Sequence, residues 1–356
     1  MSIEQYGWND EWFAKGEHYL INNRIAGRVA QEQKGMYRVW TEAGTLNAEV
    51  SGKFRFQAAE RGDFPAVGDW VILDARPQEG KGIIHQLLPR TSCFSRKVAG
   101  EVTDEQIVAA NVDTIFIVMA LNNDFNIRRL ERYLTMAWES GANPAVVLSK
   151  SDLCDDKQDK VMQVEAVAFG VPVHTVSALQ NDGLEELSGY LSSGRTVALL
   201  GSSGVGKSTI INAFAGRELQ EVQEIRESDA KGRHTTTHRE MFLLPQGGIL
   251  IDTPGMRELQ LWESVDGLKQ SFEDVEAYAL ACRFRDCTHG TEPGCAVKAA
   301  IAGGMLDRER YESYLKLQKE LAYLERKASA KARLAEKQRG RQLAKQVRNT
   351  KSGKSS

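Results

Sequence analysis

Residues 201–208 read GSSGVGKS and match the phosphate-binding pattern G-x-x-x-x-G-K-[ST]. The apolar segment TVALL precedes the loop at 196–200, and a helical segment follows at 207–215, so we expect a strand, the loop and then a helix. Glycines let backbone N–H groups point at phosphates, and Lys207 adds a positive charge for the β and γ phosphates. A glycine-rich turn without a ligand is the alternative, which the Lys and Ser at their required positions disfavour. The loop therefore predicts a nucleotide-binding α/β fold.

A second motif, Asp252-Thr253-Pro254-Gly255, follows directly after the apolar strand GGILI. An aspartate at the end of a strand can hold Mg²⁺ through water, together with the hydroxyl of Ser208, and the Gly255 N–H can contact the γ phosphate. The alternative is a plain turn, because Asp, Pro and Gly are common turn residues. The phosphate loop upstream favours the magnesium interpretation.

The choice of base is predicted by two further elements. Ser149, Lys150 and Asp152 lie in the frame of the guanine-reading pattern Asn-Lys-x-Asp, in which the aspartate accepts both N–H groups of guanine's edge. Ser177-Ala178-Leu179 ends another strand and is similar to the second base-contacting loop of GTPases. Serine replaces the usual asparagine at 149, so we expect weaker or faster-exchanging nucleotide, with guanine preference kept by Asp152. A loop without a ligand is the alternative for SKSD.

The order of these elements is the most informative feature. Both base-reading elements precede the phosphate loop, whereas in ordinary GTPases they follow it. A GTPase sheet opened between its phosphate-sensing and base-reading halves would give this order and keep every site in place. We therefore predict a circularly permuted GTPase core.

The strand and helix pattern supports this organisation. Five short alternating segments between 24 and 92 predict a small barrel of the OB type, and residues 1–23 show no clear periodicity. From 111 onward, apolar strands alternate with helical segments, which is typical of a parallel sheet covered by helices. The predicted strands are 113–121, 144–148, 171–175, 196–200, 241–244 and 248–251, and the predicted helices are 127–139, 156–169, 183–190 and 207–215.

A metal site is predicted near the C-terminal end. Cys282, Cys287, His289 and Cys295 supply four ligands in one short segment, which suits tetrahedral Zn²⁺ and leaves no open position. We therefore expect one structural zinc ion per chain, with free cysteines as the alternative. Further on, Tyr314, Leu317, Leu321 and Leu324 form one apolar helical face that we interpret as a packing stripe.

Charge is distributed unevenly. Residues 326–356 hold eleven Lys or Arg residues and one acid, Glu336, although the whole chain has a net charge of −2. A basic tail on an acidic body indicates a polyanionic partner such as nucleic acid, and a solvated disordered terminus is the alternative. We find no secretory segment and no apolar run long enough for a membrane span, and we expect a cytoplasmic protein.

Taken together, the motifs resemble the circularly permuted ribosome-biogenesis GTPases of the RsgA (YjeQ) family over nearly the whole chain. The similarity rests on the barrel with GDWV, on SKSD, SAL, GSSGVGKS and DTPG, on GRHTTT at 232–237 and on the Cys/His cluster. It implies a GTPase that acts in late maturation of the small ribosomal subunit, contacts its rRNA and is stimulated by that subunit. We expect a monomer. The implied parts are an extension (1–23), an OB-fold barrel (24–92), the GTPase domain (93–256), a zinc-binding helical domain (257–325) and a basic disordered tail (326–356).

The resemblance also assigns catalytic roles. The segment with His234 corresponds to the first switch loop, so His234 is the candidate for positioning water and Thr236 is a candidate Mg²⁺ ligand, with His238 as the second choice. Met256 and Arg257 occupy the places after DTPG where many GTPases carry a catalytic glutamine, and Gly204 replaces the asparagine of cation-dependent GTPases. Two competing readings are an RNA-binding assembly factor with a vestigial nucleotide site and an ATP-dependent kinase.

The complete expected site is as follows. The nucleotide contacts are Ser149, Lys150, Ser151, Asp152, Ser177, Ala178, Leu179, Gly201, Ser202, Ser203, Gly204, Val205, Gly206, Lys207, Ser208, Thr209, Asp252 and Gly255. The expected catalytic residues are Lys207, His234 and Thr236. The expected cofactors are GTP or GDP with Mg²⁺ held by Ser208, Thr236 and Asp252, and Zn²⁺ held by the Cys/His cluster.

Overall fold

The computed structural model describes residues 2–33, 35–97, 105–216, 239–252, 266–323 and 326. The chain forms two compact units, residues 1–260 and residues 261–356. The first unit holds a small barrel and a larger sheet, and the second is helical. The predicted domain boundaries within these units remain predictions.

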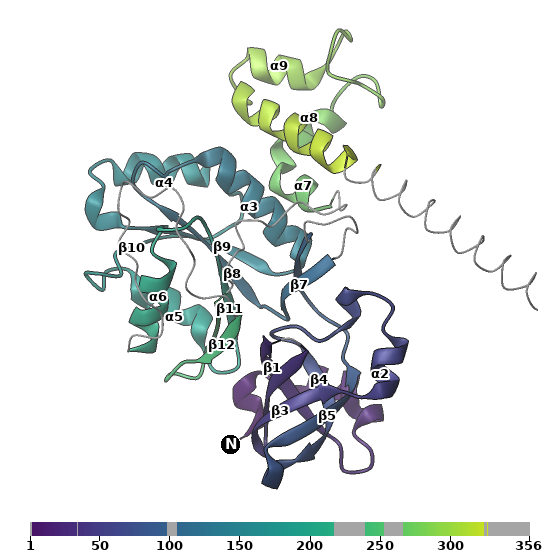
Figure 1. The fold of residues 1–356 in the computed structure, drawn as a ribbon. Helices are drawn as coiled ribbons and strands as arrows, with labels where there is room; N and C mark the ends of the chain where they lie inside the picture. The colour runs from purple at the N-terminus through teal and green to yellow at the C-terminus, as the bar shows by residue number, and fades with distance from the viewer. Residues whose placement is uncertain are drawn as a thin grey trace, which may run out of the picture. The chain divides into compact units, whose positions relative to one another are not determined.

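The N-terminal barrel has the five strands that the alternating segments predicted. They are β1 (Ile25–Gln33), β2 (Met36–Thr41), β3 (Gly44–Val50), β4 (Trp70–Arg76) and β5 (Lys81–Leu87). The strands follow the order β1-β2-β3-β5-β4, and β4 also pairs with β1, so the barrel closes on itself (Figure 1). Val29, Val39, Leu46, Val71 and Ile84 fill its interior, because side chains alternate between the two faces of each strand. The helix α2 (Gly52–Gln57) lies between β3 and β4.

The first residues of the chain pack against this barrel. They form the short elements η1 (Ile3–Tyr6), α1 (Asp10–Gly16) and η2 (Glu17–Tyr19). Tyr6 and Trp12 are buried in a cluster with Trp70 of β4, and the ring of Trp8 meets Trp70 edge-on at a centroid distance of 4.9 Å. The aromatic residues that gave no periodic signal therefore pack on the outer face of β4, in a cluster separate from the barrel interior.

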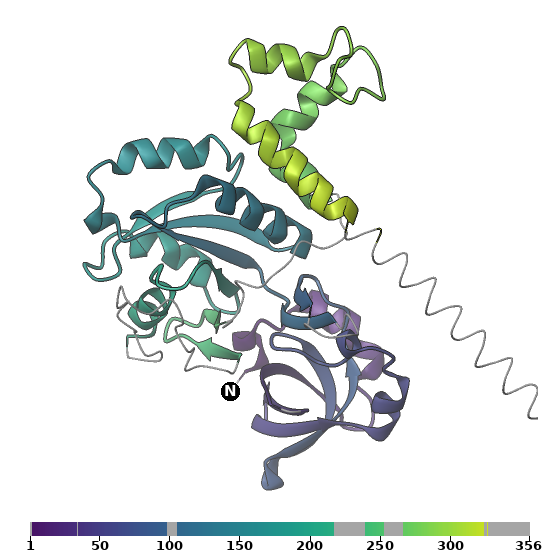
Figure 2. The same cartoon turned by 45° about the horizontal axis from the view of Figure 1, so that its top comes forward.

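The larger sheet follows the predicted alternation of strands and helices. Its strands are β8 (Thr114–Ala120), β9 (Asn143–Ser149), β10 (Val173–Val176), β11 (Thr196–Leu200), β12 (Glu240–Leu243) and β13 (Ile249–Asp252). Its helices are α3 (Ile127–Ser140), α4 (Lys157–Glu165), α5 (Leu184–Ser188) and α6 (Lys207–Ala215), with short turns η5 (Ser151–Leu153) and η6 (Gly189–Leu191). The order is β10-β9-β8-β11-β13-β12, parallel except for β12. Helices α3 and α4 cover one face and α5 and α6 the other (Figure 2).

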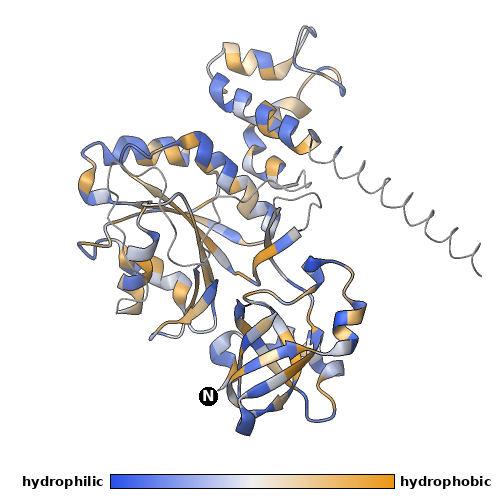
Figure 3. Cartoon of the chain, viewed as in Figure 1, coloured by the Kyte–Doolittle hydropathy of each residue, from blue (hydrophilic) through white to orange (hydrophobic). Residues whose placement is uncertain are grey.

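Hydrophobic strands hold this sheet between its helices. Phe116, Val118, Val147, Val197 and Leu199 are buried in one cluster, and the strands stand out as apolar bands against the polar outer faces of the helices (Figure 3). A parallel sheet that is covered on both faces needs such continuous apolar strands. Helix α4 is shorter than the predicted 156–169, because regular helix ends at Glu165.

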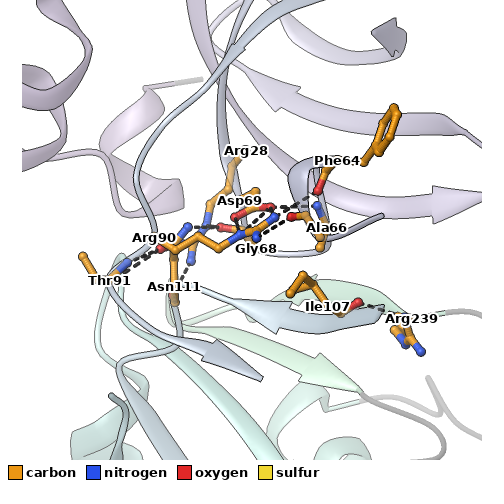
Figure 4. Close-up of polar contacts among 11 residues, drawn as sticks. Arg28, Phe64, Ala66, Gly68, Asp69, Arg90, Thr91, Ile107, Asn111 and Arg239 are labelled. Carbon is orange, nitrogen blue, oxygen red and sulfur yellow. Dashed lines mark hydrogen bonds and ion pairs between the residues drawn. The ribbon is translucent and has the colours of Figure 1, made fainter. Parts of the chain in front are cut away.

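A hairpin that the sequence pattern did not predict connects the barrel to the sheet. Strand β6 (Cys93–Lys97) pairs antiparallel with β7 (Glu105–Ala110) as a separate two-stranded sheet. Arg239, which lies immediately before β12, donates a hydrogen bond of 3.1 Å to the carbonyl of Ile107 on β7 (Figure 4). The barrel also reaches the larger sheet directly, since Gln31 of β1 pairs with Glu240 of β12.

A buried arginine joins the barrel to the sheet domain. Arg28 of β1 is only 2% exposed, and its guanidinium donates to the carbonyls of Tyr6 (2.5 Å), Gly68 (3.3 Å) and Asn111 (2.9 Å). Burial lowers the pKa of Arg28 to about 10, and the negative charges of Asp113 and Asp69 oppose this shift. The side chain therefore remains charged at neutral pH and ties three segments together (Figure 4).

The second unit is built from helices. They are α7 (Asp266–Ser271), α8 (Glu273–Leu280), α9 (Ala296–Ala302) and a helical segment at 308–323. Tyr314, Leu317 and Leu321 are buried, which confirms the predicted packing stripe for its described part; Leu324 lies outside the described residues. Arg310 forms a bidentate ion pair with Asp274 of α8, with N···O distances of 2.6 and 2.8 Å. Throughout the described residues, no helix has the length and apolar character to cross a membrane.

Candidate nucleotide site and metal centre

The segment 201–206 forms a tight loop between strand β11 and helix α6. Gly204 and Gly206 have φ angles of 73° and 96°, which favour glycine because a Cβ is strained there. At Gly201 a Cβ would lie 2.3 Å from the carbonyl oxygen of Val118 on β8, so only glycine fits. The loop therefore curls closely against the sheet and leads its backbone N–H groups into the first turn of α6.

Lys207 is the first residue of α6, and its side chain returns over the loop. The Nζ atom donates to the carbonyls of Gly201 (2.8 Å) and Ser202 (2.6 Å). Ser208 and Thr209 follow in the first helical turn and are half-buried. The structure thus places an ammonium group, two hydroxyls and the positive end of a helix dipole at one point, which is a suitable environment for phosphate.

Asp252 lies beside this loop at the end of β13. Strands β11 and β13 are parallel neighbours, with Ala198 opposite Ile251, so Asp252 follows at the carboxyl end of the sheet where the phosphate loop begins. Ser208 and Asp252 provide oxygen atoms of the kind that Mg²⁺ prefers. The remaining predicted residues of this half of the site, His234, Thr236 and Gly255, lie outside the described residues.

The predicted guanine-reading loop follows β9, two strands away from β11. Ser149 ends β9, Lys150 adopts the left-handed conformation with φ 58°, and Ser151 and Asp152 lie in η5. Ser151 is buried, whereas Asp152 is exposed. The Ser149 hydroxyl donates to the carbonyl of Val205 in the phosphate loop at 2.5 Å. This hydrogen bond connects the two halves of the expected site although 56 positions separate the residues.

The second base loop lies at the same edge of the sheet. Strand β10 pairs with β9 so that Val176 is opposite Ser149, and Ser177, Ala178 and Leu179 follow directly. Ser177 is buried and its hydroxyl accepts a hydrogen bond of 3.3 Å from the Gln180 N–H, while Leu179 is 81% exposed. All described members of the expected nucleotide site therefore lie at the carboxyl ends of neighbouring parallel strands, where open α/β sheets bind ligands.

Sequence reasoning did not find one residue that contacts this site. Arg129, in the first turn of α3, donates a hydrogen bond of 2.5 Å to the Ser202 hydroxyl and another of 2.7 Å to Asp124. No short motif contains Arg129, because its contact with the loop depends on how α3 packs on β8 and β9. The only available signal was its place in the first turn of a helix that follows a predicted strand.

The Cys/His cluster of the second unit has the geometry of a metal centre. One ligand atom from each of Cys282, Cys287, His289 and Cys295 lies within 4.8 Å of the others. The Sγ atoms of Cys282 and Cys295 are 3.9 Å apart, and His289 Nδ1 is 3.5 and 3.4 Å from them. Tetrahedral bonds of about 2.3 Å to sulfur separate ligands by roughly 3.7 Å, so the four residues fit Zn²⁺. Four protein ligands leave no open position, which indicates a structural ion.

Comparison with known proteins identifies close relatives. A family model described as RsgA GTPase matches residues 87–262, and a model described as ABC transporter matches residues 184–350. Both ranges include the phosphate loop, which many nucleotide-hydrolysing families share. The small ribosomal subunit biogenesis GTPase RsgA 1 of Oceanobacillus iheyensis is 48% identical over 90% of this chain and 92% of that protein. The small ribosomal subunit biogenesis GTPase RsgA of Methanosarcina acetivorans is 46% identical over 95% of this chain and 90% of that protein.

Solved structures agree in fold. The crystal structure of YjeQ from Thermotoga maritima aligns with a TM-score of 0.64 at 29% identity, and covers 84% of this chain and 99% of that one. The structure of YloQ, described as a circularly permuted GTPase, aligns with a TM-score of 0.61 at 24% identity, over 87% of this chain and 98% of that one. The second likeness concerns the fold alone. Together they confirm the predicted permuted architecture.

Proposed function

The chain belongs to the RsgA family of circularly permuted GTPases, and from this premise we propose that it hydrolyses GTP to GDP and phosphate during late maturation of the small ribosomal subunit. The observation that carries this proposal is the strand order β10-β9-β8-β11-β13-β12. This order gathers the base-reading loops and the phosphate loop at one edge of the sheet although the chain visits them in rotated sequence.

The described residues have distinct parts in hydrolysis. Lys207 neutralises charge on the β and γ phosphates, and the loop N–H groups hold the phosphate oxygens. Ser208 and Asp252 would hold Mg²⁺, with Thr236 as a third candidate, and the ion would supply charge neutralisation for the transferred phosphoryl group. Asp152 accepts the N–H groups of guanine and so selects GTP over ATP.

The chemical step requires a positioned water molecule. Its oxygen attacks the γ phosphorus, and the bond from that phosphorus to the bridging oxygen of GDP breaks. We assign the positioning of this water to His234, because Met256 and Arg257 occupy the places of a catalytic glutamine. Without a residue held permanently against the water, intrinsic turnover is slow, and the small subunit accelerates it by ordering the switch loop.

The other parts of the chain fit contact with ribosomal RNA. The closed barrel has the OB strand order, and Phe56 on α2 is 91% exposed, whereas Trp40 and Phe54 pack into the barrel clusters. The exposed ring of Phe56 follows the exposed Lys53 and Arg55 on the same short helix, so stacking and positive charge lie close together, as on RNA-binding surfaces. The basic segment 326–356 adds charge for the same polyanion. We place this activity in the cytoplasm, in a monomer.

The test is GTP hydrolysis measured with and without purified small ribosomal subunits. We expect slow intrinsic turnover and stimulation of at least an order of magnitude by the subunit, since ordering of catalytic groups in GTPases has effects of this size or larger. Unlabelled GDP should displace labelled GTP, and ATP should not. Subunit binding without any GTP hydrolysis would support the vestigial reading instead, and effective competition by ATP would support the kinase reading.

A further inference from the structure

Ser149 holds the position at which GTPases of this kind usually carry asparagine, and its surroundings define what it can do. The side chain is 3% exposed, at the end of β9. Its Oγ atom lies 2.5 Å from the carbonyl oxygen of Val205 and 3.4 Å from the carbonyl oxygen of Met119 on β8. The hydroxyl is therefore enclosed between strand β8 and the phosphate loop.

The number of protons on the Ser149 side chain decides whether it can also donate a hydrogen bond to a base. A serine hydroxyl has one proton to donate, and a backbone carbonyl can only accept. Both neighbours of the Ser149 hydroxyl are carbonyl oxygens. The contact with Val205 is the shorter one, so the hydroxyl donates its hydrogen bond to the Val205 carbonyl. No proton of Ser149 is then available for an acceptor on a purine base.

Asparagine at this position can donate more hydrogen bonds than serine. Its carboxamide carries two N–H donors, so one can hold the phosphate loop and the other can reach a base. Guanine presents two acceptors, N7 and O6, on its Hoogsteen edge. Its N–H donors, at N1 and N2, lie on the Watson–Crick edge. Serine keeps the bond to the loop and loses the second donor.

We propose that Ser149 is a positioning residue that fixes the phosphate loop and gives no hydrogen bond to guanine N7, so that base selection depends on the N1 and N2 edge read by Asp152. This inference deepens the proposed GTPase function and rests on it. Guanine is still distinguished from adenine, because adenine does not present that pair of N–H donors to a carboxylate. Asp152 is an exposed residue, so a base can approach it.

The direct test compares GDP with 7-deaza-GDP, in which a C–H group replaces the N7 acceptor. Dissociation constants are measured by isothermal titration on the full-length protein with Mg²⁺ present. We expect the unmodified chain to bind the two nucleotides within about twofold of each other. Ser149→Asn should bind GDP more tightly than 7-deaza-GDP by about fivefold, the effect of one hydrogen bond.

Two further variants separate positioning from base contact. Ser149→Thr keeps a hydroxyl with one proton and should remain indifferent to N7. Ser149→Ala removes the bond to Val205, and should weaken GDP and 7-deaza-GDP binding by the same factor. Circular dichroism shows whether each variant is folded, and the unmodified chain tests the proposal without any variant.

A loss of fivefold or more on 7-deaza-GDP with the unmodified chain would overturn the proposal. So would Ser149→Asn if it gained no dependence on N7. Failure of the unmodified chain to bind GDP or to hydrolyse GTP is a different result, because it would contradict the proposed function itself.

Discussion

The guanidinium of Arg129 donates a hydrogen bond of 2.5 Å to the hydroxyl of Ser202, a residue of the phosphate loop 73 positions further along the chain. Asp124 accepts a second bond from the same Nη1 atom at 2.7 Å and so fixes the arginine in place. Helix α3 therefore supports the loop from the side of β8. Because the loop must hold its curled shape to bind phosphate, this support is expected to affect affinity.

Replacing Arg129 tests the support. We expect Arg129→Gln to weaken GDP binding about tenfold, since a hydrogen bond from a charged donor contributes about 1.5 kcal/mol. Arg129→Lys keeps the charge and should lose less, and Ser202→Ala combined with Arg129→Gln should not add to the single loss. Isothermal titration with GDP provides these values. Full additivity of the two changes would show that the contact does not support the loop.

Asp152→Asn should remove guanine recognition. The carboxylate accepts two N–H groups, whereas an amide oxygen accepts less strongly and its NH₂ group opposes them, so we expect GDP affinity to fall at least a hundredfold. Asp155→Asn changes an exposed acid three positions away and provides the matched control. Titration of both variants with GDP measures the difference. Equal affinity in both variants would remove Asp152 from the site.

The features of the fold and site that could be predicted are those encoded by residues close together in the sequence. The strand before GSSGVGKS and the helix after it are local patterns, and both occur as β11 and α6. The barrel could be predicted because its segments are short, alternating and broken by glycine and proline, and the Cys/His cluster because its ligands lie close together in sequence. These features depend on neighbours along the chain.

The features that were missed depend on residues far apart in sequence. The hairpin of β6 and β7 pairs segments that lack a clear alternating pattern, so periodicity did not reveal it. Arg129 meets the loop only after α3 has packed on the sheet, and the Ser149 hydroxyl meets Val205 only after β9 and the loop have converged. The sequence shows serine at position 149, where asparagine is usual. The structure adds that this serine keeps a hydrogen bond to the phosphate loop.

Arg28 should be essential for the stability of the first unit. Its guanidinium serves three carbonyls in a buried position, so Arg28→Ala leaves unpaired polar groups and should lower the free energy of unfolding by about 3 to 5 kcal/mol. Arg24→Ala is the control, because Arg24 pairs with Asp74 at the surface, where a pair contributes about 0 to 1 kcal/mol. Urea unfolding followed by tryptophan fluorescence measures both. Similar midpoints for the two variants would contradict the role assigned to Arg28.

Removal of one cysteine should empty the metal centre. Cys295 is the N-cap residue of α9, so Cys295→Ser removes a zinc ligand at the point where that helix begins. We expect the bound zinc to fall from one per chain to near none, with reduced helix content in the second unit, because a structural site and its fold form together. Cys154→Ser is the control, because Cys154 lies outside the cluster, and this variant should keep one zinc ion per chain. Metal analysis and circular dichroism measure these quantities, and full zinc occupancy in Cys295→Ser would contradict the assigned ligand set.

His234 and His238 can be distinguished by separating binding from turnover. A residue that positions water stabilises the transition state without holding the ground-state nucleotide, so His234→Ala should keep its affinity for GTP and lose subunit-stimulated hydrolysis by two orders of magnitude or more. His238→Ala is the matched control and should retain most of the stimulation. Both variants are assayed at saturating GTP with a fixed excess of small ribosomal subunits, after subunit binding has been checked by co-sedimentation. The opposite result, with stimulation lost in His238→Ala and kept in His234→Ala, would transfer the role to His238, and stimulation kept in both would show that neither histidine positions the water.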